Sequence, residues 1–152
     1  MHDVFRVLRT AGSALSTQRL RLNVIANNIA NVNTTRTAEG GAYHRRRIVV
    51  EPQERAFQLP LPSSFAAAST LGPDDSIAGV KATRIVIDDT PGPRVYEPGH
   101  PDADAEGYVE YPNVDVVTEM TDMISATRSY QANVTVIDSI KQLAMKALEI
   151  GR

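Results

Sequence analysis

The sequence predicts a mainly α fold in which two long helices, at the N- and C-terminal ends, form a coiled-coil-like axial domain around a small β-rich and irregular insert. Apolar residues recur at a spacing of 3.5 over residues 3–32 and again after residue 112, which is typical of amphipathic helices. Most of the Pro and Gly residues lie between these two stretches, where they exclude a long helix. We therefore divide the chain into 1–33 (N-terminal axial helix), 34–111 (insert) and 112–152 (C-terminal axial helix).

The C-terminal stretch has the clearest helical pattern. No Pro or Gly interrupts it between Pro112 and Gly151, and a helix of about 36 residues would span on the order of 54 Å. One small globule cannot bury such a helix along its length, so it needs a partner. Asn113 is the predicted N-cap, and Asp115 and Glu119 favour the positive end of the helix dipole. The predicted apolar stripe comprises Val116, Met120, Met123, Thr127, Tyr130, Val134, Ile137, Lys141, Ala144 and Leu148.

The N-terminal stretch repeats this spacing, with Gly12 as a weak point. We expect the helix to fray over 27–33, where four Asn side chains compete for backbone hydrogen bonds. The same Asn side chains could instead bond across a helix interface and fix its register, and both outcomes can hold together. The predicted stripe comprises Val4, Leu8, Ala11, Leu15, Gln18, Leu22, Ile25, Ile29 and Val32.

The insert is predicted to hold a few short strands that depend on the helices for stability. One strand is expected near 43–50, stopped by Pro52, and a second near 80–87. These two could pair, with 94–96 as a candidate third strand. The remaining expectations are a flexible loop or linker over 51–78 and an extended loop over 94–114, ordered by itself or on assembly.

Charge is distributed unevenly along a chain whose net charge is −2. Residues 1–50 hold eight Lys or Arg against two Asp or Glu, whereas residues 51–152 hold eight against sixteen. The preferred explanation is that the basic segment lies against the acidic part of this chain or a neighbour. Nucleic-acid binding through Arg45–Arg47 is the alternative, but few aromatic residues accompany the basic ones.

Motifs for enzymatic chemistry are not found in the sequence. The absence of Cys excludes disulfides, thiolate metal sites and Cys nucleophiles, and no apolar run reaches membrane-spanning length. No cleavable secretory signal is expected. His100 with Asp102, Asp104 and Glu106 could form a metal cluster, but the spacing fits no known loop, and a solvated turn in which His100 bonds locally is preferred. We expect no enzyme activity, cofactor or small-molecule substrate.

Three blocks of residues resemble the bacterial flagellar basal-body rod proteins. The first covers 11–31, which includes the run Asn27-Asn28-Ile29-Ala30-Asn31. The second lies within 95–114 and is similar to members of the proximal rod. The third is formed by 119–133 and 147–152. The blocks lie at both ends of the chain and together cover about two-thirds of it.

The resemblance implies a structural role in the rod, the drive shaft that transmits motor torque for motility. It implies other rod proteins and further copies of this chain as partners in a helical tube, and export by the flagellar type III apparatus into the basal body. Nucleic acid is not an implied partner. The terminal helices are expected to order on assembly. A coiled-coil adaptor or export chaperone, which would form a stable dimer, is the main rival.

Under this resemblance, a set of residues in the three blocks is expected to pack between subunits, with Ala126, Ala132 and Asn133 at close helix contacts. The whole set comprises Leu15, Leu22, Asn23, Asn28, Ile29, Asn31, Tyr96, His100, Tyr108, Asn113, Ala126, Arg128, Tyr130, Ala132 and Asn133.

Overall fold

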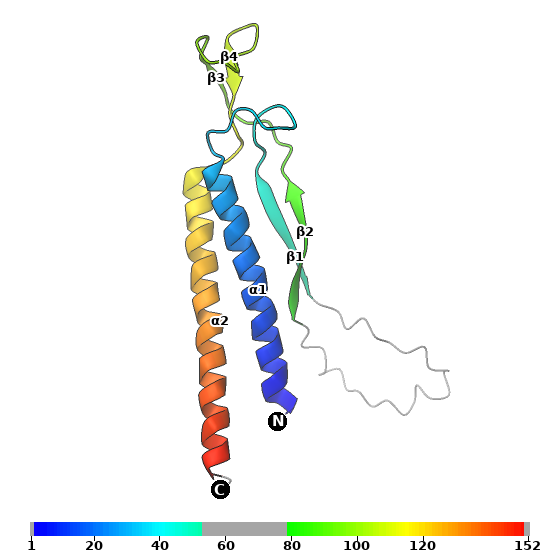
Figure 1. The fold of residues 1–152 in the computed structure, drawn as a ribbon, viewed down its shortest axis with the longest axis vertical. Helices are drawn as coiled ribbons and strands as arrows, with labels where there is room; N and C mark the ends of the chain where they lie inside the picture. Colours follow the sequence, from blue (N-terminus) through cyan, green and yellow to red (C-terminus); the bar gives the residue numbers. More distant parts are fainter. Residues whose placement is uncertain (1, 53–78, 151–152) are drawn as a thin grey trace, which may run out of the picture.

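The computed structural model describes residues 2–52 and 79–150, and its framework is a pair of antiparallel helices. Helix α1 spans His2–Ala30 and α2 spans Val116–Ile150, and the two lie side by side over most of their length (Figure 1). The predicted fold class, with two terminal helices and a small β insert, is confirmed. Most of the loop predicted over 51–78 lies outside the described residues.

In the described part of the insert there are two separate antiparallel sheets of two strands each. Strands β1 (Arg46–Pro52) and β2 (Val80–Ile87) form the first sheet, here called the ribbon, which runs alongside α1. Strands β3 (Arg94–Tyr96) and β4 (Tyr108–Glu110) form the second sheet. We call residues 94–110 the tip hairpin, because they project beyond the adjacent ends of both helices (Figure 1).

The candidate third strand, 94–96, does not join the first sheet, because β3 pairs with β4, with Val95 opposite Val109. The segment predicted as an extended loop is therefore a folded hairpin. Its return turn is held by Asp104, whose Oδ1 accepts hydrogen bonds from the backbone N–H groups of Glu106 and Tyr108 at 2.9 Å each. Gly107 completes the turn at φ +85°, where a side chain would be strained.

The first strand ends at Pro52, the residue predicted to stop it, and Pro52 is its last residue, opposite Val80. A proline is tolerated at a strand end because no ladder donor is required there. The strand also begins at Arg46, three residues later than predicted, because Ala42 and Tyr43 are buried in the preceding loop.

In the stripe predicted on α1, Ala11 and Ile25 are buried, Val4 is exposed, and the other six residues are half-buried. A second stripe was not predicted: Thr17, Val24 and Asn28 are also buried. The ribbon covers this side of α1, and the backbone N–H of Val80 donates to the Ser13 hydroxyl at 3.1 Å.

The stripe predicted on α2 is wrong at Met120, which is 55% exposed while the neighbouring Glu119 is buried, and at Lys141, Ala144 and Leu148, which are exposed. A spacing of 3.5 residues does not decide which of two adjacent residues near a helix start faces inward. Here it is Glu119, because Asn28 and Arg45 bind its carboxylate. Residues 141–149 are all exposed. The expectation that α2 is too long for one chain to bury is thus confirmed.

Candidate functional site at the junction of helices and insert

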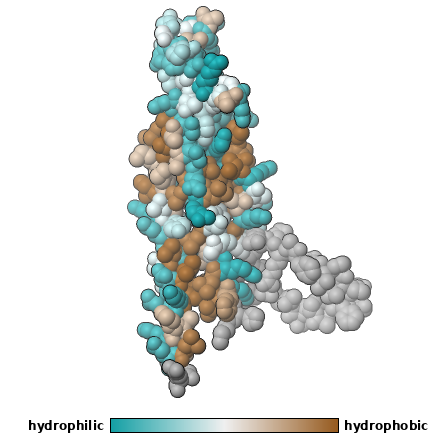
Figure 2. Space-filling view, viewed as in Figure 1, coloured by the Kyte–Doolittle hydropathy of each residue, from teal (hydrophilic) through white to brown (hydrophobic). Residues whose placement is uncertain are grey.

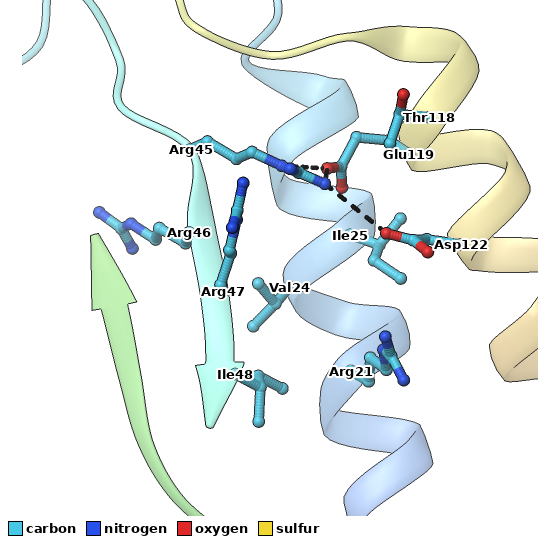
Figure 3. A pocket seen from close by; sticks show the side chains of 10 residues that line it. All are labelled: Arg21, Val24, Ile25, Arg45, Arg46, Arg47, Ile48, Thr118, Glu119 and Asp122. Atoms are coloured by element: carbon cyan, nitrogen blue, oxygen red, sulfur yellow. Dashed lines mark hydrogen bonds and ion pairs between the residues drawn. The ribbon is translucent and has the colours of Figure 1, made fainter. Parts of the chain in front are cut away.

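The start of α2, the end of α1 and the entry to the ribbon meet around the carboxylate of Glu119. This side chain is 1% exposed. Its Oε1 accepts a hydrogen bond from Arg45 Nε at 2.6 Å and also contacts the terminal guanidinium nitrogen of Arg45 (Figure 3). Its Oε2 accepts a hydrogen bond from Asn28 Nδ2 at 3.1 Å. Buried carboxylates of this kind need charge-assisted partners, and Glu119 has one from each of two elements.

Asn28 uses the full hydrogen-bonding capacity of its side-chain amide. Its Oδ1 accepts from the backbone N–H of Arg46 and from the Tyr43 hydroxyl, both at 3.0 Å. Its Nδ2 donates to the Arg46 carbonyl at 2.9 Å and to Glu119. Two acceptor and two donor positions are therefore filled. The amide bonds to both main-chain groups of Arg46, as a neighbouring strand would, and so fastens the start of β1 to α1.

Tyr43 completes this side of the junction. Its ring is buried, and the Arg46 guanidinium lies 5.6 Å from the ring centroid. Burial raises the pKa of the Tyr43 hydroxyl above its usual value, and the Glu119 carboxylate raises it further, against the opposing effect of Arg46. The hydroxyl therefore stays protonated at neutral pH and donates to Asn28.

Asn113 joins the two strands of the ribbon to the start of α2. Its Oδ1 accepts from the backbone N–H of Arg45 at 2.7 Å, and its Nδ2 donates to the carbonyls of Asp88 and Thr90 at 2.8 and 2.9 Å. The Asp88 N–H donates to the Arg45 carbonyl at 2.8 Å. The reciprocal bond, from the Arg45 N–H to the Asp88 carbonyl, is replaced by the Asn113 amide, which binds both of these groups.

The predicted N-cap role of Asn113 is therefore wrong. Asp115 caps α2 instead: its carboxylate accepts from the backbone N–H of Val117 at 3.0 Å and from the Thr118 hydroxyl. The bond from Thr118 is the main cause of a lowered pKa for Asp115. Asn113 is unavailable as a cap because the ribbon already uses both ends of its amide.

A groove of about 320 Å³ lies between α1, β1 and the start of α2 (Figure 3). Glu119 and Asp122 approach it from α2, and Arg45 bridges them, with 3.6 Å from its guanidinium to the Asp122 carboxylate. The apolar side of the groove is formed by Val24, Ile25 and Ile48. Arg45 is bound to both Glu119 and Asp122, which fixes the segment before β1 to the start of α2.

The tip hairpin is tied back to the loop after α1. The Asp102 carboxylate accepts from the Thr35 hydroxyl at 2.8 Å and pairs with Arg36 at 3.5 Å, and the Thr35 bond is the main cause of its lowered pKa. His100 Nδ1 accepts from the Asp102 backbone N–H at 3.1 Å, so the predicted local bond of His100 is confirmed. Within the described ranges, no group of three potential ligands that could hold a metal ion is found.

The charge asymmetry of the sequence is explained in part by contacts within the chain. Arg45 pairs with Glu119, Arg36 with Asp102, and Arg47 with Asp88 at 3.0 Å. The expectation that the basic segment lies against the acidic part is confirmed for these pairs.

The structure separates the predicted packing residues into buried, intermediate and exposed groups. Asn28 and Ala126 are buried within the chain, and Asn113 is half-buried and bound to the ribbon. The other half-buried residues are Leu15, Leu22, Ile29, Asn31, His100, Tyr130 and Asn133. The exposed residues are Asn23, Tyr96, Tyr108, Arg128 and Ala132. Contact of any of them with a neighbouring subunit stays a prediction.

Sequence reasoning missed Arg45 as the partner of Glu119, and it assigned Glu119 only to the helix dipole. One signal was available: Glu119, Ala126 and Asn133 recur at intervals of seven, which places them on one side of a helix. No local pattern pointed to Arg45, since its partner lies 74 residues away.

Comparison with known proteins matches both ends of the chain to flagellar families. Residues 8–36 match the flagella basal body rod protein family, and residues 105–150 match the C-terminal family of flagellar basal body rod FlgEFG proteins. The flagellar basal-body rod protein FlgC of Bacillus subtilis is 41% identical over 97% of this chain and 98% of its own length. The proteins of the same name from Borreliella burgdorferi and Escherichia coli O157:H7 are 43% and 39% identical, over 97% and 98% of both chains respectively.

The chain belongs to the FlgC family of flagellar basal-body rod proteins. This confirms the family indicated by the three residue blocks. In this FlgC-family chain, Asn28 lies in the first matched segment, and Asn113 and Glu119 lie in the second. The two matched segments are therefore held together at the junction, through residues 91 positions apart in the sequence.

Proposed function

We propose that this protein is a structural subunit of the proximal rod of the flagellar basal body. It packs with other rod proteins and with further copies of itself into a helical tube that transmits motor torque. Membership of the FlgC family supports the rod assignment. The observation that carries the assembly step is the large apolar surface that a single copy leaves exposed on both helices.

This surface has two parts. Val117, Met120 and Ile124 lie on the outer side of α2 near the junction, and Val117 is 72% exposed. At the opposite end of the helix pair, Phe5 of α1 and Leu148 of α2 are also exposed. Figure 2 shows apolar residues on both flanks of the molecule and toward its lower end. Burial of such residues between subunits would supply the main driving force for assembly.

The junction gives the subunit the stiffness that torque transmission requires. A load applied to the insert reaches both helices through Asn28, Arg45 and Glu119, whose hydrogen bonds resist sliding of one helix along the other. The proposed role involves no bond-making step, substrate or cofactor. Export by the flagellar type III apparatus into the rod follows from the family resemblance. None of the helices in the described ranges is long and apolar enough to span a membrane.

The first test is sedimentation of the purified chain with circular dichroism over a concentration series, alone and mixed with other rod proteins. The proposal expects polymers to form as concentration rises or partners are added. A compact dimer at every concentration would favour the adaptor or chaperone, and salt-dependent oligonucleotide binding without polymers would favour a nucleic-acid protein.

Ala132 provides a variant that separates assembly from folding. It is exposed on α2, whereas Ala126, six residues earlier, is 2% exposed. Ala132→Trp should leave monomer unfolding unchanged and block motility in a bacterium that lacks its own FlgC-family protein. Ala126→Trp should instead destabilise the monomer by overpacking. Normal swimming with Ala132→Trp would contradict the predicted close contact at this position.

A further inference from the structure

The ribbon and the tip hairpin carry opposite charge and unpartnered apolar side chains. We propose that the tip hairpin of one copy docks on the exposed side of the ribbon of an adjacent copy. This inference rests on the proposed function, since it requires copies of the chain to lie next to one another. It goes beyond the packing of helices, because it assigns a contact between subunits to the insert.

The ribbon is the basic partner. Its two strands contain four basic residues and one acidic residue, Glu51, whose carboxylate accepts from the Thr83 hydroxyl. Arg47 is paired with Asp88, and Arg46 lies over Tyr43. Lys81 and Arg84 of β2 are exposed, and no acidic partner binds them among the described residues.

The ribbon also has an open edge at the Ile87 end of β2, whereas the Val80 N–H at the other end donates to the Ser13 hydroxyl of α1. Asn28 occupies both main-chain groups of Arg46 on the outer edge of β1. Ile87 is opposite Arg46 in the register. Because the main-chain groups of Arg46 bind Asn28 and not β2, the two residues form a non-hydrogen-bonded pair, in which the main-chain groups of both residues point away from each other. The main chain of Ile87 therefore points outward from β2. Val86, on the same face of β2 as Arg84, is 39% exposed, and Ile85 and Ile87, on the other face, are each 49% exposed. Hydrophobic residues gather over this part of the ribbon in Figure 2. An open edge of β-branched residues is usually covered in a native assembly.

The tip hairpin is the acidic partner. Residues 94–110 contain five acidic residues against one Arg, and the tip is predominantly hydrophilic in Figure 2. Arg94 is already bound to Asp104 and lies 5.3 Å from the centroid of the Tyr108 ring. The Glu106 and Glu110 side chains are exposed and have no ion pair within the described part of the chain.

The tip hairpin also presents aromatic surface. Tyr96 and Tyr108 are opposite one another in the register, with ring centroids 5.3 Å apart, and Tyr96 is 62% exposed. Aromatic rings pair favourably with β-branched residues on neighbouring strands, and Glu pairs with Arg or Lys. The face of the hairpin that carries Tyr108 and Glu110 therefore offers the two kinds of side chain that match Val86 and Arg84, which lie together on one face of β2.

A single copy cannot make this contact with itself. The ribbon runs alongside α1, whereas the tip hairpin projects away from the helices in the opposite direction from the ribbon's far end (Figure 1). The Asn113 amide holds the ribbon and the start of α2 in this arrangement. A second copy displaced along the long axis brings its tip hairpin level with the ribbon, so the contact joins successive subunits along the axis.

Charge reversal tests the contact. Arg84→Glu and Glu110→Arg should each lower the polymerised fraction about fivefold or more, because like charges then face each other. The double variant should recover most of the loss. Glu39→Arg, an exposed reversal outside both surfaces, should assemble normally. Circular dichroism of each monomer checks that the fold is retained.

The absence of Cys from the chain permits a second, independent test. Arg84→Cys and Glu110→Cys variants, mixed and oxidised during assembly, should form disulfide-linked dimers, and neither variant alone should do so. Absence of both the cross-link and the rescue by the double reversal, while the unaltered chain polymerises, would overturn this inference and leave the proposed function intact. Failure of the unaltered chain to polymerise under any condition would overturn the proposed function itself. Loss of oligonucleotide binding in Arg84→Glu with unchanged assembly would assign the ribbon to nucleic acid instead.

Discussion

The Glu119 carboxylate on α2 lies 3.1 Å from the side-chain amide of Asn28 on α1, and this bond fixes how the two helices align. Both side chains are 1% exposed, and both also bind the segment that leads into β1. Displacement of either helix by one turn would leave a buried carboxylate and a buried amide without partners. The cost of such unpaired groups makes the alignment specific.

Replacement of Glu119 should strongly destabilise the chain. Glu119→Ala leaves the Arg45 guanidinium, which is 17% exposed, with only the more distant Asp122 as partner. We expect a loss of about 3 kcal/mol in the free energy of unfolding, as for other broken buried pairs. Urea unfolding followed by circular dichroism measures it. Asp138→Asn, on an exposed site of the same helix, is the control, and an equal effect of the two substitutions would contradict the role of Glu119.

Two replacements of Asn28, by Ala and by Asp, should differ in how the free energy of unfolding depends on pH. Asn28→Ala removes four hydrogen bonds and should cost about 2 kcal/mol or more. Asn28→Asp places a second carboxylate beside Glu119, so it should be more destabilising at pH 7 and partly recover as the pH falls and one carboxyl is protonated. Asn27→Ala is the matched control, because within the described ranges the Asn27 side chain bonds only to the Asn23 carbonyl of α1 itself. A pH-independent deficit in Asn28→Asp would argue against the carboxylate contact.

Two glycine substitutions should act in opposite directions. A Cβ at Gly92 would overlap the carbonyl oxygen of Tyr111, a backbone atom that cannot move without displacing the junction. Gly92→Ala should therefore destabilise the insert. Gly12→Ala should stabilise the monomer by up to about 1 kcal/mol, because Gly12 lies within α1 with open space around it. Thermal unfolding of both variants provides the comparison, and a stabilising Gly92→Ala would contradict the close approach.

Acid should loosen the tip hairpin and the start of α2. The pKa values of Asp102, Asp104 and Asp115 are lowered, chiefly by hydrogen bonds from the Thr35 hydroxyl, the Tyr108 backbone N–H and the Thr118 hydroxyl respectively. Groups with lowered pKa values in the folded state contribute stability at pH values above about 4, and this contribution is lost as the pH falls through their folded pKa values.

Amide hydrogen exchange at pH 6 and pH 3, corrected for intrinsic rates, should show loss of protection in 100–110 and in the first turn of α2. Asp102→Asn should reduce the difference in hydrogen-exchange protection between pH 6 and pH 3 in the turn that contains residue 102. Equal protection of the tip hairpin at both pH values would refute this assignment.

The helices could be predicted from the sequence because their pattern is local and long. Ala11 and Ile25 of α1 were placed correctly by spacing alone. Asn28 was also foreseen as a residue that could bond across an interface, and the helix continues past it to Ala30. The fraying expected over 27–33 occurs only after Ala30. The side chains of Asn27 and Asn31 bond to carbonyls four residues earlier and so do not end the helix sooner.

The junction could not be predicted because its partners are far apart in sequence. Arg45 reaches Glu119 only because the loop after α1 returns along the start of α2, and no pattern in residues 34–45 specifies that path. Asn113 was read as a cap from its position before a helix, yet its amide bonds to the ribbon. The pairing of β3 with β4 was missed because three-residue strands are too short to show a period.

The antiparallel packing of α1 and α2 has a consequence for growth. It places the start of α1 and the end of α2 together at one pole of the molecule, and the acidic hairpin at the other (Figure 1). When the tip hairpin of one copy binds the ribbon of the next, unlike surfaces meet, and such a heterologous contact forms an open array with a direction unless its rotation closes a ring. The two ends of that array differ chemically, so an incoming subunit meets a different surface at each end and elongation can proceed from one end alone.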